Sequence, residues 1–322
     1  MLRYSVKRLL QSCITLLLVV SILFLMLRLM PIHGYFPDGA WDKMSWDAKL
    51  NVLVKLGLYG TDGNPINPFI QLFTYFKNIV TTFSLGETTQ IYPGTQVTDL
   101  IAQRIPVSMS ISSVAFVFSL SLGCILGVLM ARYKESIIDG LGMVYIVLAN
   151  SIPALVYYFI VQLNVTRWIG ASMIYRSGQL ITFVTPVICL IIGPLASNAL
   201  WIRRYMVDEF NRDYVKLAYA KGLPSRDVMF GHVLRNAFVP MAYSVPQTIV
   251  FTLSGSLLVE RLFSIPGMGR LLVDSADKRD NNLVQALVFI YAAMGIIGVF
   301  LGDVLAVIVD PRISFTRKGG LR

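Results

Sequence analysis

The chain has 322 residues, of which 55% are apolar and only 14% are charged, and its mean hydropathy is +0.65. Soluble domains carry about 25% charged residues, so this composition excludes an ordinary water-soluble protein. The net charge of +10 does not indicate a nucleic-acid-binding protein, because the Lys and Arg residues are divided among short segments between long apolar runs. Such an arrangement orients a membrane protein in the bilayer.

Apolar runs of about 20 residues mark transmembrane helices, and the sequence contains six of them. The first follows the basic residues 1–8. It lacks a small-x-small cleavage site, so a retained helix with a cytoplasmic N-terminus is preferred over a signal peptide. We therefore predict an all-α polytopic membrane protein with both termini in the cytoplasm and a long external segment after the first helix. The six predicted spans are 9–27, 107–130, 137–163, 180–202, 238–259 and 283–309.

The external segment is predicted to cover residues 31–104. Ser45 is expected to cap a short helix that stops at Gly57. Apolar residues from Phe69 to Phe83 recur at helical spacing, which predicts an amphipathic helix lying at the membrane surface. The chain is accordingly divided into residues 1–100, the first helix with its external segment, and residues 101–322, a core of five spans.

Two glycines in the second span, Gly123 and Gly127, are four residues apart. This small-xxx-small spacing allows two helices to approach closely. Gly298 and Gly302 repeat the same spacing in the last span. The sequence therefore predicts close helix–helix packing at both places.

The longest polar insertion between apolar runs covers residues 213–240 and is basic. Its predicted form is two short helices broken at Gly222-Leu-Pro224, with Asp213 and Ser225 as their N-caps. Such a pair makes a compact basic knob. Composition alone leaves two interpretations open: a docking element for a soluble partner, or an ordinary loop whose positive charges fix the topology.

Two pieces of this insertion, YVKLAYAKGL from Tyr214 and HVLRNAFVP from His232, closely resemble the cytoplasmic loop of bacterial ABC importer permeases. The resemblance is to the first of the two permeases in the oligopeptide, dipeptide and nickel branch. The general importer pattern begins Glu-Ala-Ala, whereas this chain has Lys216, Leu217 and Ala218 there. The match is therefore to the peptide branch.

Other segments carry the same resemblance. Residues 260–272, ERLFSIPGMGRLL, resemble the external loop that follows the fifth span in this family, and Asp310-Pro-Arg312 resembles its C-terminal signature. The segments 56–58, 123–127 and 151–153 also fit. The resemblance covers nearly the whole chain, and it implies a type I ABC importer permease fold.

The resemblance implies a heteromeric importer in a bacterial cell membrane. Its expected partners are a second homologous permease, two ATP-binding subunits and an extracytoplasmic binding protein that delivers a peptide. The chain lacks a Gly-x4-Gly-Lys-Ser/Thr phosphate loop. We therefore expect no enzymatic activity and no cofactor or metal on this chain, with ATP and Mg held by the partner subunits. An importer of nickel or another small solute is the alternative within the family.

Two other classes of protein fit the sequence less well. An ion-coupled secondary transporter usually has ionisable groups near the middle of the membrane. Here Asp139 and Glu260 fall at the ends of predicted spans, and Asp303 is interpreted as a packed helix residue. An intramembrane enzyme is not indicated, since the sequence has neither an HExxH nor a GxSxG motif.

The interpretation as an importer permease predicts the residues of three candidate surfaces. The pathway between the permeases, or else hydrogen bonds between helices, is expected to involve Asn150, Ser151 and Gln247. Contact with the binding protein is expected through Phe263, Ile265 and Met268. The resemblance implies that the ATPase contacts lie within 211–238, at Asp213, Tyr214, Lys216, Ala218, Ala220, Lys221, Gly222, Leu223, Arg226 and Arg235, the last standing where the shorter importer pattern has Pro.

Overall fold

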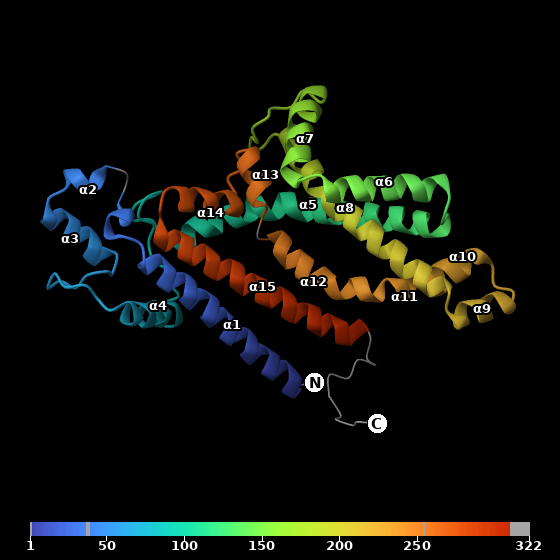
Figure 1. Ribbon diagram of the computed structural model, residues 1–322, viewed down its shortest axis with the longest axis horizontal. Coiled ribbons are helices and arrows are strands. Elements are labelled where there is room, and N and C mark those ends of the chain that lie inside the picture. The colour runs from blue at the N-terminus through green and yellow to red at the C-terminus, as the bar shows by residue number, and fades with distance from the viewer. Residues whose placement is uncertain (1, 37–38, 254, 310–322) are drawn as a thin grey trace.

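The computed structural model describes residues 2–36, 39–253 and 255–309, and most of these residues are helical. Long helices run along an elongated molecule, with α2 and α3 at one end and α9 and α10 at the other (Figure 1). The helices are, in chain order, α1 (Leu2–Arg28), the 3-10 helix η1 (Ile32–Tyr35), α2 (Ala40–Lys43), α3 (Trp46–Lys55), α4 (Pro68–Thr82), α5 (Val97–Arg132), α6 (Ile137–Ser151), α7 (Ala154–Trp168), α8 (Leu180–Phe210), α9 (Asp213–Ala220), α10 (Ser225–Asp227), the π-helix η2 (Val228–Leu234), α11 (Arg235–Ala237), α12 (Val239–Leu253), α13 (Leu257–Leu262), α14 (Met268–Asp277) and α15 (Asn281–Val309).

The prediction of a polytopic helical membrane protein is confirmed. Four described helices are long and apolar enough to cross a membrane, and α6 and α7 give a fifth crossing if they are counted as one broken span. The predicted fifth span contains α12, which has 15 residues. At 1.5 Å per residue a helix of this length covers about 22 Å, less than the roughly 30 Å of hydrocarbon. The six apolar runs are therefore six helical regions of unequal length.

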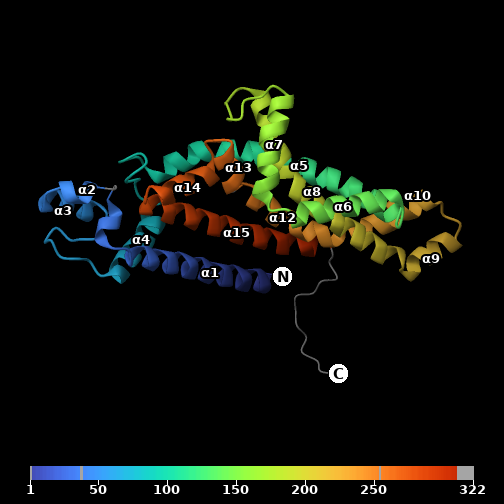
Figure 2. The same ribbon diagram turned by 45° about the horizontal axis from the view of Figure 1, so that its top comes forward.

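The predicted third span is not one straight helix. Its two halves, α6 and α7, meet at an angle of 106°, and α7 stands away from the long helices in both ribbon views (Figure 2). The break lies at Ile152 and Pro153, where Ile152 is extended, with φ −83° and ψ 128°. A residue before proline is pushed out of the helical region, and proline has no N–H to continue the ladder.

The close packing predicted at Gly123 and Gly127 is confirmed. A Cβ atom added to Gly127 would lie 2.6 Å from the carbonyl oxygen of Ala199, and one added to Gly123 would lie 2.6 Å from Cβ of Asn198. The backbones of α5 and α8 therefore touch along this stripe. Helix α5 is also longer than predicted, because it continues without a break through Pro106.

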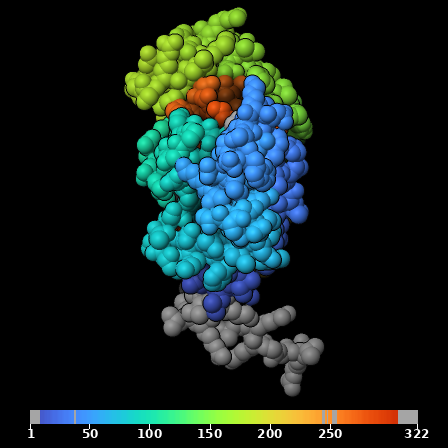
Figure 3. All heavy atoms as spheres, turned by 90° about the vertical axis from the view of Figure 1, so that its left-hand side faces the viewer, coloured from blue at the N-terminus to red at the C-terminus, as the bar shows by residue number. Residues whose placement is uncertain are grey.

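The external segment has its own small core, formed by Tyr35, Phe36, Leu53 and Leu58. The cap predicted at Ser45 is confirmed, since its Oγ accepts a hydrogen bond from the N–H of Ala48 at 3.4 Å. The predicted amphipathic helix is α4, whose membrane-surface position remains a prediction. Figure 3 shows the end of the molecule that carries α2 and α3. The blue and cyan external segment covers much of this end, and orange atoms of the C-terminal third are visible beside it.

The segment after α4 is fixed to the core by one buried carboxylate. Asp280 is fully buried and accepts hydrogen bonds from the backbone N–H groups of Thr89, Gln90 and Ile91 at 3.0, 2.9 and 3.2 Å. Residues on both sides of the proposed boundary at residue 100 also share an apolar cluster. The C-terminal signature Asp310-Pro-Arg312 lies outside the described residues.

Candidate functional site

The basic insertion forms a bent pair of helical arms at one end of the molecule (Figure 1). The break predicted at Gly222 is confirmed by its left-handed φ of +81°. The N–H of Gly222 donates to the carbonyl of Tyr219 at 2.9 Å, and the N–H of Leu223 donates to that of Ala218 at 3.3 Å. These two bonds are the Schellman arrangement, which ends a helix at a glycine.

The predicted N-caps are wrong. Arg212 and Pro224 occupy the cap positions of α9 and α10, and neither helix has a side-chain cap. Asp213 lies inside the first turn, where its carboxylate accepts a hydrogen bond from Lys216 Nζ at 2.9 Å. This hydrogen bond holds the pKa of the Asp213 carboxyl below its usual range. The negative charge of Asp213 therefore interacts favourably with the positive, N-terminal end of the α9 dipole, although Asp213 is not the N-cap residue.

The second arm does not end before the next apolar helix. Residues 225–253 run from α10 through the π-helix η2 and α11 into α12, and the N–H of Ala242 donates to the carbonyl of Phe238 at 2.9 Å across the last junction. The basic arm is therefore continuous with α12.

Most of the predicted coupling residues are exposed, but Ala218 is not. Ala218 is buried with Val215 against Ile202 and Met206 of α8, so it holds α9 on the core and is removed from the partner-facing set. Tyr214 is half-buried. Its hydroxyl donates to Glu209 and accepts from Asn236 Nδ2, and burial raises its pKa. The exposed members are Asp213, Lys216, Ala220, Lys221, Gly222, Leu223, Arg226 and Arg235.

Sequence reasoning missed an apolar part of this surface. Leu217, Tyr219 and Phe230 are 56%, 43% and 48% exposed although all three are large and apolar. Their available signal was their spacing, since Leu217 and Tyr219 directly flank the buried Ala218 in α9. A surface with an apolar centre and a charged rim is the usual composition of a protein interface.

A cavity of about 480 Å³ lies between α5, α8 and α12. Neither Asn150 nor Ser151 lines it: both lie at the end of α6, and the Asn150 amide donates to the carbonyl of Ile146 in its own helix at 2.9 Å. The side chain of Gln247 lies outside the described residues. Sequence reasoning thus missed the polar residues that line this inner cavity, which are Ser112, Ser119, Ser197, Asn198, Thr248 and Ser256.

The three predicted binding-protein contacts are corrected. Phe263, Ile265 and Met268 are all at most 1% exposed, so their side chains support the loop from inside the chain. The loop is further held by Gln162 of α7, whose amide donates to the carbonyl of Leu262 at 3.0 Å. Their position in a Gly/Pro-rich loop led to the prediction of a contact surface. In the structure the three side chains are buried and hold the loop on the core.

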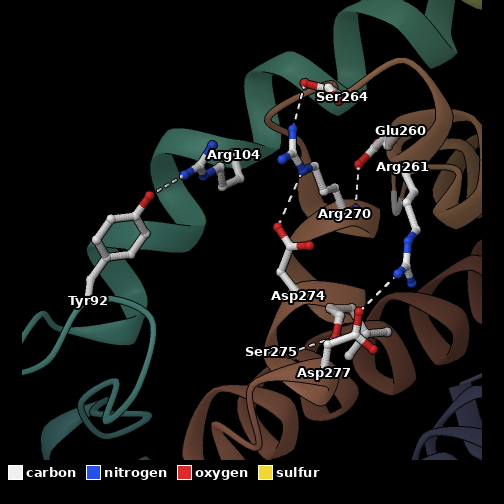
Figure 4. A network of polar contacts seen from close by, with 10 residues as sticks. Tyr92, Arg104, Glu260, Arg261, Ser264, Arg270, Asp274, Ser275 and Asp277 are labelled. Carbon is white, nitrogen blue, oxygen red and sulfur yellow. Dashed lines mark hydrogen bonds and ion pairs between the residues drawn. The ribbon is translucent and has the colours of Figure 1, made fainter.

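Polar side chains of the same loop gather around Glu260 (Figure 4). Glu260 is 3% exposed. Its carboxylate accepts hydrogen bonds from the Ser108 hydroxyl at 2.7 Å and from the backbone N–H of Arg270 at 3.0 Å. The Arg270 side chain donates to the carbonyl of Ser264 at 2.8 Å and pairs with Asp274. The sequence placed Glu260 at a span end but gave no sign of these partners.

Comparison with known proteins places the chain among transport proteins. Residues 123–315 match the family described as "Binding-protein-dependent transport system inner membrane component". The chain is 32% identical to the dipeptide transport system permease protein DppB of Lactococcus lactis subsp. cremoris, over 97% of this chain and 99% of that protein. It is 30% identical to DppB of Bacillus subtilis, over 99% of this chain and 100% of that protein.

It is also 29% identical to the oligopeptide transport system permease protein OppB of Haemophilus influenzae, over 98% of this chain and 100% of that protein. The crystal structure of an amino acid ABC transporter overlaps with 67% of this chain and 95% of its own, at 17% identity and a TM-score of 0.49. With more than half its length matched by one family and its whole length by permease relatives, the chain belongs to the binding-protein-dependent transport system inner membrane components.

Proposed function

We propose that the chain is the first permease subunit of an ATP-driven ABC importer for dipeptides or oligopeptides. The observation that carries the proposal is the exposed basic element with its glycine bend and its continuous path into α12. The names of the whole-length relatives support the peptide class. In this proposal the chain is not an enzyme, and ATP and Mg belong to its partners.

The proposed assembly contains this chain, a second homologous permease, two ATP-binding subunits and an extracytoplasmic binding protein. Both termini are cytoplasmic in this arrangement, so α9 and α10 face the ATPases and α13 and α14 face the outside. The proposed division into residues 1–100 and 101–322 separates the first membrane helix and its external segment from a core of five spans. The family model matches residues 123–315, which lie within the second part.

The proposed mechanism couples ATPase closure to the inner cavity. The exposed rim of Lys216, Lys221 and Arg226 and the apolar Leu217 between them fit a cleft on one of the two ATPases. When that cleft moves, the second arm moves with it and carries α12, which forms one wall of the inner cavity. The polar lining of Ser and Asn side chains provides hydrogen-bond partners for a solute that has left water.

The test is transport by the complete complex reconstituted in vesicles. We expect uptake of a labelled di- or oligopeptide only when ATP and the binding protein are both present. A proton gradient without ATP is the matched control, and uptake driven by that gradient alone would overturn the proposal in favour of a secondary transporter. ATP-dependent uptake of nickel with no peptide uptake would retain the importer and reject the peptide class.

A further inference from the structure

A cavity separate from the inner one lies at the root of the basic element. Its volume is about 500 Å³, within the roughly 300–1,000 Å³ that is usual for small-molecule sites. Two cations line it, Arg132 at the end of α5 and Lys134 in the turn that follows. Both ribbon views place this turn beside α10 (Figures 1 and 2). The cavity therefore lies between the core and the arms of the basic element.

The remaining lining consists of neutral donors and apolar groups. Asn211 follows α8, Tyr219 lies on α9 and Ser225 begins α10, and each of these side chains carries an amide or a hydroxyl. The buried Ala131 and Met229 belong to the apolar part. None of the described residues that line the cavity is acidic. The lining therefore favours an anionic ligand.

The two cations are not neutralised by their neighbours. Among the described residues no carboxylate pairs with Arg132, whose guanidinium lies over the ring of the next residue, 5.3 Å from its centre. Lys134 pairs with Glu135 at 3.4 Å, but the two side chains are 51% and 82% exposed, and exposed pairs are weak. The buried carboxylate of Asp139 is already bound by Arg203 at 2.6 and 2.7 Å. Both cations are therefore available to a ligand.

A phosphate group suits this set of donors. It has three strong acceptor oxygens, and it accepts both the forked guanidinium of an arginine and the point charge of a lysine. Here the cations come from the turn after α5, while the hydroxyls of Tyr219 and Ser225 come from the basic element. An acceptor with oxygens in several directions can contact both sets at once.

An exposed apolar strip begins beside the cations. Ile137 and Leu141 are 81% and 66% exposed, and they lie one turn apart at the start of α6, so they share one face of that helix. At the end of a membrane helix, apolar side chains contact acyl chains, and basic side chains next to them lie at the level of the lipid headgroups. The cavity and the strip therefore match the two parts of a phospholipid.

We propose that this cavity binds a phosphate-bearing anion, which ties Arg132 and Lys134 of the core to Tyr219 and Ser225 of the basic element. The headgroup of an anionic phospholipid and a free phosphate compound share this chemistry, and the strip at Ile137 favours the lipid. Placing that lipid in the inner leaflet rests on the orientation given under the proposed function. The site itself does not depend on transport.

The experiment follows amide hydrogen exchange of residues 219–229 in the full-length chain in nanodiscs. Nanodiscs of phosphatidylcholine alone are compared with nanodiscs that also contain phosphatidylglycerol. We expect phosphatidylglycerol to slow this exchange at least about threefold, the factor that a ligand at twice its Kd gives. Arg132→Gln with Lys134→Gln should raise the phosphatidylglycerol content needed for half of this effect by about tenfold or more, because both charged donors are lost.

Arg204→Gln with Arg212→Gln is the matched control, since it removes the same charge from the same end of the molecule. Arg204 lies 5.4 Å from the centre of the Trp201 ring, Arg212 pairs with Glu209, and neither arginine lines the cavity. The protection by phosphatidylglycerol should be unchanged in this variant. A site that only gathers lipid through net charge would lose protection equally in both double variants.

Inorganic phosphate added to the phosphatidylcholine nanodiscs separates the two sources. Protection by phosphatidylglycerol alone identifies the lipid, and protection by phosphate identifies a free phosphate compound; both results keep the site. The site is rejected if neither anion slows exchange, if Arg132→Gln with Lys134→Gln keeps the protection, or if the control variant loses it equally. Because no measurement requires ATP, protection in a chain without ATP-dependent peptide uptake would keep the site and reject the proposed function.

Discussion

Arg203 of α8 binds Asp139 of α6 through two charge-assisted hydrogen bonds, from Nε to Oδ1 at 2.6 Å and from Nη2 to Oδ2 at 2.7 Å. Asp139 also accepts from the N–H of Glu135 at 3.0 Å. Both side chains are largely removed from solvent, at 20% and 7% exposure. The pair fixes the turn before α6 to the end of α8 that leads into the basic element.

We predict that Arg203→Ala destabilises the protein strongly, by about 3–5 kcal/mol, because it leaves the Asp139 carboxylate buried without its partner. The double variant Asp139→Asn with Arg203→Gln should recover part of this loss, since no charge is then stranded. The measurement is the unfolding temperature of the purified complex in detergent.

The matched control for this pair is Arg261→Ala, which breaks the exposed ion pair with Asp277. Exposed pairs contribute about 0–1 kcal/mol, so the unfolding temperature should hardly change. Equal destabilisation by Arg203→Ala and Arg261→Ala would show that the buried ion pair contributes no more to the stability of the protein than the exposed one.

We predict that Gly222→Val impairs transport while the protein remains in the membrane. The left-handed φ at Gly222 costs a residue with a side chain about 1–2 kcal/mol, and a β-branched residue more. No atom lies within 4 Å of the position of its added Cβ, so the effect is on the bend and not on packing. Peptide uptake and recovery of the ATPase with the purified permease are the measurements.

Gly222→Asn is the control for the same position, because Asn tolerates the left-handed region better than other residues. Its uptake should lie between wild type and Gly222→Val. Unchanged uptake and ATPase recovery with Gly222→Val would contradict the role assigned to the bend.

Local patterns in the sequence predicted the features that depend on neighbouring residues. Gly123 and Gly127 predicted the contact between α5 and α8. Ser45 predicted the N-cap of α3, and Gly222 predicted the bend of the basic element. Each of these features depends on a residue type at a particular position or spacing in the local sequence. The helix break at Pro153 follows from the same chemistry. The apolar run around it hid the break, since hydropathy is insensitive to helix direction.

Features that depend on distant residues were not predictable in this way. Glu260 meets Ser108, and Arg203 meets Asp139, only after the helices have packed. The reverse error occurred at Phe263, where an apolar loop residue was assigned to a surface but is buried. Pairing and burial at these positions are properties of the tertiary structure, and a single sequence does not display them.

We predict that Gly127→Ala lowers stability by about 1–3 kcal/mol, the usual cost of inserting a methyl group into a closely packed contact. The added Cβ would lie 2.6 Å from the backbone oxygen of Ala199, which can move only if the helices separate. Gly140→Ala in α6 is the matched control, since nothing lies within 4 Å of its added Cβ. Alanine there should be neutral or stabilise the helix by about 0.5–1 kcal/mol.

Thermal unfolding of the two variants provides the measurement. The prediction fails if the two glycine variants unfold at the same temperature, because the α5–α8 stripe would then tolerate a wider spacing than the structure shows.

Asp280→Ala should release the external segment from the core without unfolding the helices. Its carboxylate is the shared acceptor for the N–H groups of Thr89, Gln90 and Ile91, and removing it leaves these three donors without that partner. We expect amide hydrogen exchange at these residues to rise by about tenfold or more, since each lost bond to a charged acceptor contributes about 1.5–3 kcal/mol. Asp274→Ala, at an exposed carboxylate of α14, should leave this exchange unchanged. Equal exchange in Asp280→Ala and wild type would show that the apolar cluster and the hydrogen bond from Asn282 to the carbonyl of Glu87 are enough to hold the segment.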